Sequence, residues 1–276
     1  MIDRGNVIST LVILSMAKDL MSADSQSIEW VFFDVGSVLF NDDPQNFLAY
    51  RLVHERILDR HPGYTFEDML AEREEHARNG ANWILHSISK RLLPDVSARG
   101  LFKEIREHLI PTYDENHIPN DGMHEVLEQL AGKYRLGILA NQPAECRHSL
   151  QRRGVLQHFE VVAISDELEL HKPDVKLYEW ATGQTGSAPQ RAVMIGDRRD
   201  NDIAPAQQAS MRTILVEWSK WTAKNWRPAD PQAVAFLESC DRVPLFKSKH
   251  SHVQPDQVVG SLTEIPGALQ SMGPSD

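Results

Sequence analysis

The 276-residue sequence has few cysteines and no apolar run long enough to cross a membrane. Its two cysteines, Cys146 and Cys240, are too few for a disulfide framework and lack the spacing of metal ligands, which suits a reducing compartment. The apolar run at residues 7–14 is too short to span a bilayer, and no basic start or small-residue cleavage site marks it as a signal peptide. We therefore predict a cytoplasmic protein, with residues 1–26 as a non-essential N-terminal extension that is partly disordered.

Positive charge is also scarce. The chain has 29 Lys and Arg against 39 Asp and Glu, a formal net charge of −10. Nucleic acids and anionic membrane surfaces favour a basic patch, and the cluster of Arg147, Arg152 and Arg153 is more typical of a solvated helix face. We expect neither a nucleic-acid nor a membrane partner. The hydrophobic fraction of 41% is sufficient for a sizeable core.

Three short apolar runs each end abruptly on a polar residue. The runs and the residues that end them are 30–33 with Asp34, 134–140 with Asn141, and 191–196 with Asp197. Such runs are typical of buried strands, and open α/β sheets bind ligands at the carboxyl ends of their strands. A lysine, Lys172, lies on a predicted loop before Pro173. Two carboxylates gathered with this lysine predict a divalent-cation site, although Asp34 alone could simply cap a turn.

In order and spacing, these segments resemble the motifs of the haloacid dehalogenase-like superfamily, most of whose members are magnesium-dependent phosphatases. The resemblance is carried by Asp34, by Ala140-Asn141, by Lys172-Pro173-Asp174, and by Gly196-Asp197-Arg198-Arg199-Asp200-Asn201-Asp202-Ile203. It covers most of residues 28–217. Together with the alternation of strands and helices, it implies an α/β fold with a doubly wound parallel sheet, the superfamily's Rossmann-like core.

The resemblance also implies roles for single residues. Asp34 would attack phosphorus and form a phosphoaspartyl intermediate, with Lys172 neutralising charge beside it. Mg²⁺ would be held by Asp34, Asp197 and the backbone carbonyl of Gly36. The substrate would be a small phosphorylated metabolite. The other candidates are Ser37, Asn141 and Gln142 for substrate binding, with Asn141 using its backbone N–H or its amide, and Asn201 and Asp202 as supporting residues.

The gap between the first two predicted strands is far longer than an ordinary crossover. Residues 43–118 have helical periodicity, and the resemblance implies a helical cap that closes over the site. The core would comprise residues 27–42 and 119–276, including an edge strand and a terminal helix after residue 252. A tryptophan-rich insertion at about 218–251 would pack on the core, line a pocket rim or mediate self-association. The cap residues that could face substrate are Arg73, Arg78, Trp83 and His86, and we expect Trp83 in the cap core and the arginines on the surface.

Two positions depart from the family pattern. The family's phosphatases usually carry an aspartate two residues after the nucleophile, as general acid and base, where this sequence has Gly36. A Ser or Thr that would hydrogen-bond the phosphoryl group is replaced by Ala140. Neither residue can transfer a proton or donate a side-chain hydrogen bond. The losses favour substrates with good leaving groups, such as acyl, aryl or anomeric sugar phosphates, or a water or cap residue acting in place of the missing acid. Restoring both side chains is expected to raise activity on poor leaving groups.

Two other functions remain open. In a metal-independent 2-haloacid dehalogenase, an equivalent aspartate attacks carbon, but Asp197 in an intact Gly-Asp motif favours metal. A catalytically weak binding protein would keep the fold while its chemistry decays. Retention of Asp34, Lys172 and Asp202 favours a hydrolase instead.

Overall fold

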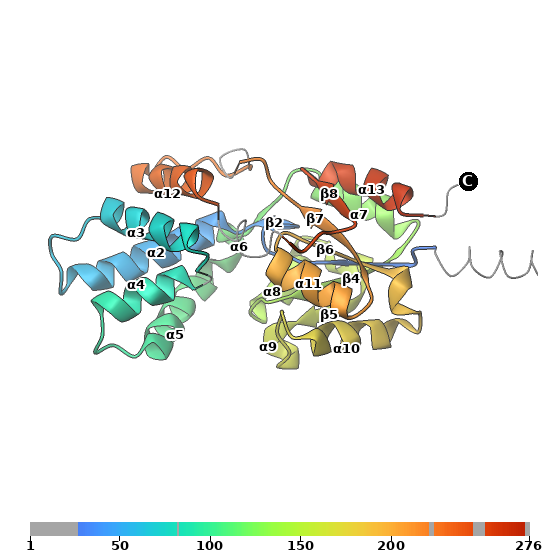
Figure 1. Cartoon of the computed structure of the whole chain (residues 1–276), viewed down its shortest axis with the longest axis horizontal. Coiled ribbons are helices and arrows are strands. Elements are labelled where there is room, and N and C mark those ends of the chain that lie inside the picture. Colours follow the sequence, from blue (N-terminus) through green and yellow to red (C-terminus); the bar gives the residue numbers. More distant parts are fainter. Residues whose placement is uncertain (1–26, 82, 221–223, 245–251, 274–276) are drawn as a thin grey trace, which may run out of the picture.

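The computed structural model describes residues 27–81, 83–220, 224–244 and 252–273, and its larger part is built on a six-stranded parallel sheet (Figure 1). In spatial order the strands are β5 (Phe159–Ile164), β4 (Arg135–Ala140), β1 (Trp30–Phe33), β6 (Ala192–Gly196), β7 (Arg212–Val216) and β8 (Gln257–Val259). The order runs outward from β1 in both directions, which confirms the predicted doubly wound fold. The predicted strands at 134–140, 191–196 and in the C-terminal segment are also confirmed.

Helices cover both faces of this sheet (Figure 1). They are α7 (Met123–Ala131), α8 (Glu145–Arg152), α9 (Ser165–Leu168), α10 (Val175–Thr185), α11 (Ala204–Gln208) and α13 (Ile265–Ser271), with short turns η2 (Leu156–His158), η3 (Pro189–Arg191), η4 (Arg199–Ile203) and η6 (Leu262–Glu264). In β1, Val31 and Phe33 pack on one face while Trp30 and Phe32 pack on the other. Because successive side chains of a strand point to opposite faces, a sheet covered on both sides requires an unbroken apolar run.

The register of β1 brings the predicted polar residues to one edge of the sheet. Phe33, its last residue, pairs with Ile138 of β4 on one side and Ile195 of β6 on the other. Asp34, Asn141 and Asp197 follow these strands, so all three lie beyond the carboxyl ends of adjacent strands. This is the edge where an open parallel sheet binds ligands.

A second group of helices lies to one side of the sheet in Figure 1. We call it the helical subdomain, formed by α2 (Asp43–Leu58), α3 (Phe66–Arg78), α4 (Ile84–Leu92), α5 (Ala98–Leu109) and α12 (Pro231–Arg242). The first four lie within the predicted cap segment. The turns η1 (Ile110–Thr112) and α6 (Tyr113–Asn116) and the two-stranded sheet of β2 (Phe40–Asn41) and β3 (Ile118–Pro119) connect it to the core.

Helix α12 lies after the last predicted cap residue, yet it packs on α2 and α3 (Figure 1). Its buried residues Ala233, Phe236, Leu237 and Cys240 form one apolar stripe that completes the core of the helical subdomain. The assignment of residues 218–251 to the core is therefore wrong for this helix, because its apolar stripe faces other helices and not the sheet.

Two expectations for single residues are also corrected. Arg73 is 1% exposed instead of lying on the surface. Its Nη1 donates to the carbonyls of Ser239 and Val243, both at 3.1 Å, and so satisfies carbonyls at the C-terminal end of α12. Trp83 is 79% exposed instead of lying in the cap core. Of the insertion's tryptophans, Trp226 packs on the helical subdomain, whereas Trp221 and the predicted extension 1–26 lie outside the described residues.

Within the described ranges, no helix combines the length and the apolarity that crossing a membrane requires.

Candidate active site

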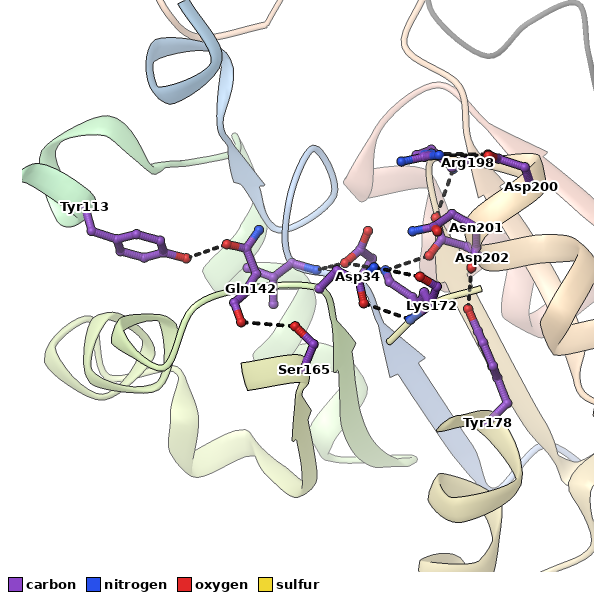
Figure 2. A network of polar contacts seen from close by, with 12 residues as sticks. Asp34, Tyr113, Gln142, Ser165, Lys172, Tyr178, Arg198, Asp200, Asn201 and Asp202 are labelled. Carbon is purple, nitrogen blue, oxygen red and sulfur yellow. Dashed lines mark hydrogen bonds and ion pairs between the residues drawn. The ribbon is translucent and has the colours of Figure 1, made fainter. Parts of the chain in front are cut away.

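Lys172 lies between two carboxylates at the carboxyl edge of the sheet (Figure 2). Its Nζ lies 2.7 Å from Oδ1 of Asp34 and 2.7 Å from Oδ1 of Asp202. Burial lowers the pKa of Lys172, but the charges of Asp202 and Asp34 outweigh this effect and raise it above its ordinary value. The lysine therefore remains a cation although its side chain is almost completely buried.

Asp34 has one oxygen held in place and one available. Oδ1 faces Lys172 and also accepts a hydrogen bond from the backbone N–H of Val35 at 2.7 Å. Oδ2 has no hydrogen-bond partner among the residues the structure describes. Burial raises the pKa of Asp34 to about 6, against the opposing effect of Lys172. At neutral pH the side chain is mostly a carboxylate, with its second oxygen able to act as a nucleophile or a metal ligand.

Asp197 completes a cluster of three carboxylates. Asp34, Asp197 and Asp202 each offer an oxygen within 4.8 Å of the others. Burial and the charges of Asp202 and Asp34 raise the pKa of Asp197 well above its ordinary value. Asp197 makes no hydrogen bond or ion pair with any described residue. Oxygen donors with this excess of negative charge fit a hard divalent cation such as Mg²⁺, whose charge would offset the repulsion.

Both carboxylate oxygens of Asp202 are used in contacts within the protein. Oδ1 binds Lys172, and Oδ2 accepts the backbone N–H of Arg198 at 3.0 Å. The turn that carries it lies against the end of β6, where a Cβ on Gly196 would lie 2.2 Å from the Cβ of Asp202. Glycine is therefore required before Asp197, and Asp202 acts as the lysine's anchor.

Asn141 holds the loop of Lys172 through its side chain. Its Oδ1 accepts the backbone N–H of Lys172 at 2.8 Å, and its Nδ2 donates to the carbonyl of Lys172 at 2.9 Å. Both ends of the amide are used in this pair. The side chain thus positions the lysine, and because this pair leaves one hydrogen of Nδ2 unused, contact of the amide with substrate stays a prediction.

The other predicted residues lie around the same cavity. Ser37 has a left-handed backbone, φ 57°, and accepts a hydrogen bond from Nε1 of Trp218 at its carbonyl, at 2.8 Å. Gln142 accepts the hydroxyl of Tyr113 at Oε1, at 2.9 Å (Figure 2). The backbone carbonyl of Asn201 accepts the hydroxyl of Tyr178 at 2.6 Å (Figure 2), so the turn beside Asp202 is fixed from the side of α10.

These groups line a cavity of about 340 Å³ between the sheet edge and the helical subdomain. Its lining residues from the core and the connecting turn are Asp34, Gly36, Ser37, Asp42, Asn141, Gln142, Lys172, Asp197, Arg198 and Asn201, and those from the helical subdomain are Asp43, Asn46, Tyr50, Arg73, Trp83, Phe236 and Cys240. Arg73 and Trp83 thus line the cavity, and both were among the cap residues that could face substrate. Sequence reasoning missed Asp42 and Phe236. Asp42 could have been found, because the run Asn41-Asp42-Asp43 offers more polar side chains than one helix start needs.

Comparison with known proteins supports the same fold. A family model described as haloacid dehalogenase-like hydrolase matches residues 63–216, more than half of the chain. A glyceraldehyde 3-phosphate phosphatase of Methanothermobacter thermautotrophicus is 29% identical over 197 residues, covering 67% of this chain and 84% of the relative. A phosphoserine phosphatase of Thermus thermophilus is 35% identical over 112 residues, covering 40% of this chain and 43% of the relative.

Solved structures share the fold at low identity. A haloacid dehalogenase-like protein of unknown function from Agrobacterium tumefaciens has a TM-score of 0.61 at 19% identity, covering 90% of this chain and 100% of that one. A 2-haloacid dehalogenase from Pseudomonas syringae has a TM-score of 0.52 at 20% identity, covering 88% of this chain and 99% of that one. At these identities the likeness establishes architecture alone. The extent of the family match, with phosphatases among the similar relatives, identifies the chain as a hydrolase that belongs to the haloacid dehalogenase-like family.

Proposed function

We propose that the protein is a Mg²⁺-dependent phosphatase that hydrolyses a small phosphomonoester through an aspartyl phosphate on Asp34. One observation carries the proposal. A single buried lysine, Lys172, lies 2.7 Å from both Asp34 and Asp202, while Asp197 remains beside them with no described partner. The names of the similar relatives, phosphatases of glyceraldehyde 3-phosphate and phosphoserine, support this reaction class.

In the first step, Oδ2 of Asp34 attacks phosphorus and the bond to the leaving group breaks. Lys172 keeps Oδ1 in place and balances negative charge that develops at the reacting centre, and Asp202 keeps the lysine there. In the second step, water attacks the aspartyl phosphate and releases phosphate. Splitting the reaction in this way replaces one difficult displacement by two easier ones.

A metal would be held by Asp34, Asp197 and the backbone carbonyl of Gly36, all of which line the cavity. When bound, Mg²⁺ would supply positive charge to the phosphoryl oxygens and offset their repulsion from Asp34. Asn141 through its backbone N–H, Gln142 through its amide, and Ser37 are proposed to contact the phosphoryl group.

The helical subdomain is proposed to act as the lid over this site and to select the substrate. Its side of the cavity offers the aromatic surfaces of Tyr50, Trp83 and Phe236 and the cation of Arg73. The organic part of the substrate would lie against these residues, with water excluded when the lid closes. We propose that the protein works in the cytoplasm, in keeping with the free, buried thiols of Cys146 and Cys240.

The test is a phosphate-release screen of the purified protein on acyl, aryl, anomeric sugar and alkyl phosphates, with Mg²⁺ or with EDTA. We expect release that requires Mg²⁺ and that disappears in Asp34→Asn, since an amide of the same volume cannot act as the nucleophile. Metal-independent halide release from a 2-haloacid would instead favour a dehalogenase. Absence of turnover on every substrate would favour a binding role.

A further inference from the structure

The space beside Gly36 is already occupied by another carboxylate. A Cβ placed on Gly36 would lie 2.9 Å from Oδ2 of Asp42 and 3.1 Å from Nε2 of Gln142. An aspartate at position 36 would therefore direct its side chain at the site that Asp42 now fills. The glycine leaves room for a carboxylate that comes from six residues further along the chain.

The carboxylate of Asp42 is not used in the way its position predicts. Asp42 is the N-cap residue of α2, where an aspartate normally accepts a hydrogen bond from the first turn of the helix. Its side chain makes no such bond. The backbone N–H of Asp43 instead donates to Oδ1 of Asn41 at 3.0 Å. Asp42 is thereby free to face the cavity, which it lines.

Two contacts fix the position of Asp42. The hydroxyl of Ser37 donates to its Oδ1 at 2.9 Å, and Ser37 is in turn held by the bond from Trp218 to its carbonyl. The backbone carbonyl of Asp42 accepts the N–H of Asn46 at 3.0 Å, which ties the residue to the first turn of α2. With Oδ1 and the backbone held in this way, Oδ2 is the oxygen that lies nearest the space beside Gly36.

The other carboxylates of the cavity have different tasks. Asp34 is the nucleophile, Asp197 is assigned to the metal, and Asp43 forms a buried ion pair with Lys224 at 2.9 Å. Hydrolysis of an alkyl phosphate nevertheless requires one proton for the leaving oxygen and the removal of one proton from water. Among the described residues that line the cavity, Asp42 is the carboxylate left for this task.

We propose that Asp42 is the acid–base residue of this protein, replacing the aspartate that the sequence lacks at position 36. The inference rests on the proposed phosphatase reaction. As the P–O bond to the leaving group breaks, Asp42 gives its proton to the leaving oxygen and the alcohol departs. Asp42, now a carboxylate, takes a proton from the water that attacks the aspartyl phosphate. Asp34 and inorganic phosphate are released, and Asp42 is protonated again for the next cycle.

The first experiment compares the parent with Asp42→Asn, using glycerol phosphate and p-nitrophenyl phosphate with Mg²⁺. With glycerol phosphate we expect the rate of hydrolysis by Asp42→Asn to be about 10²–10⁴-fold lower than that of the parent. On p-nitrophenyl phosphate we expect a rapid release of about one equivalent of nitrophenol per enzyme and then slow turnover, because Asp34 can still attack a substrate whose leaving group needs no proton. The matched control is Asp59→Asn at the opposite, exposed end of α2, which should keep the parent rates.

The second experiment moves the carboxylate back. Gly36→Asp alone should lower activity and melting temperature, because its side chain would meet Oδ2 of Asp42 and place two carboxylates together. Gly36→Asp combined with Asp42→Gly removes that conflict, and glycine is tolerated at an N-cap. We expect the double variant to hydrolyse glycerol phosphate about 10²-fold faster than Asp42→Gly alone.

The outcomes separate this inference from the proposed function. A parent that releases no phosphate from any substrate would overturn both. If the parent is active and Asp42→Asn hydrolyses glycerol phosphate at a rate within about tenfold of the parent rate, the role of Asp42 is overturned while the proposed function stands. A folded Asp42→Asn that also loses the initial nitrophenol release would overturn it too, since the residue would then only support the loop of Asp34.

Discussion

Replacing Lys172 by methionine should destabilise the protein strongly at neutral pH and much less at pH 5. The lysine is the cation between Asp34 and Asp202, and its removal leaves three carboxylates with oxygens within 4.8 Å of one another. Methionine keeps most of the side-chain volume, so the change is chiefly one of charge. Breaking a buried pair by removing one partner costs about 3–5 kcal/mol.

The pH dependence follows from the direction of the pKa shifts. Burial already raises the pKa of Asp34 to about 6, and Lys172 opposes this rise. Without the lysine the pKa of Asp34 rises further, so the folded state binds protons more tightly than the unfolded chain. Stability is then lost as the pH rises through the folded-state pKa and regained as the pH falls.

The measurement is thermal unfolding in EDTA between pH 5 and pH 8. Because a change of 1 kcal/mol corresponds to about 2–4 °C for a chain of this size, we expect a fall of about 10 °C or more at pH 8. The difference in melting temperature between the variant and the parent should be much smaller at pH 5. Lys176→Met is the matched control, since Lys176 is exposed on the neighbouring helix. An equal fall at both pH values would refute the electrostatic explanation and point to lost packing.

Three further predictions concern the proposed metal ligand Asp197, the helical subdomain and the loop of Ser37. Asp197→Asn should raise the melting temperature in EDTA at pH 8 by a few degrees, because it removes a carboxylate whose pKa is raised by burial and by its charged neighbours. It should also abolish any stabilisation by Mg²⁺. Phe236→Ala, at a position 3% exposed, should cost about 3–5 kcal/mol in denaturant unfolding, whereas Val234→Ala on the exposed face of the same helix should change stability little. Trp218→Phe keeps an aromatic ring but loses the hydrogen bond to the carbonyl of Ser37. The substitution should lower the free energy of unfolding by about 1 kcal/mol and reduce the rate of phosphate release. An unchanged rate would mean that this hydrogen bond does not position the loop of Ser37.

The sheet and its polar edge could be predicted from the sequence because both depend on local patterns. A strand buried on both faces needs an uninterrupted apolar run, and the residue after it lies at the ligand-binding edge. Asp34 and Asp197 follow such runs directly, and Lys172 precedes a proline in the order the resemblance requires. Their spatial grouping follows from parallel pairing with β1.

The placement of α12, and whether the residues around it are buried or exposed, could not be predicted in this way. Periodicity shows that a helix has an apolar stripe but not which surface covers it. Arg73 is buried because the end of α12 presents carbonyls to it, and Trp83 is exposed although aromatic residues usually lie inside. The role of Asp42 depends on a close approach to Gly36 that no sequence spacing reveals.

The late position of α12 in the chain has a consequence for the order of folding. During synthesis, α2, α3, α4 and α5 emerge long before the segment that covers them, and four of the six strands of the parallel sheet are made in between. Until then, the apolar surface that receives Phe236 and Leu237 has no cover from α12. The helical subdomain can therefore reach its final packing only after most of the core has been translated. Its completion depends on contacts between segments far apart in the chain, so the two parts of the molecule mature together instead of one after the other.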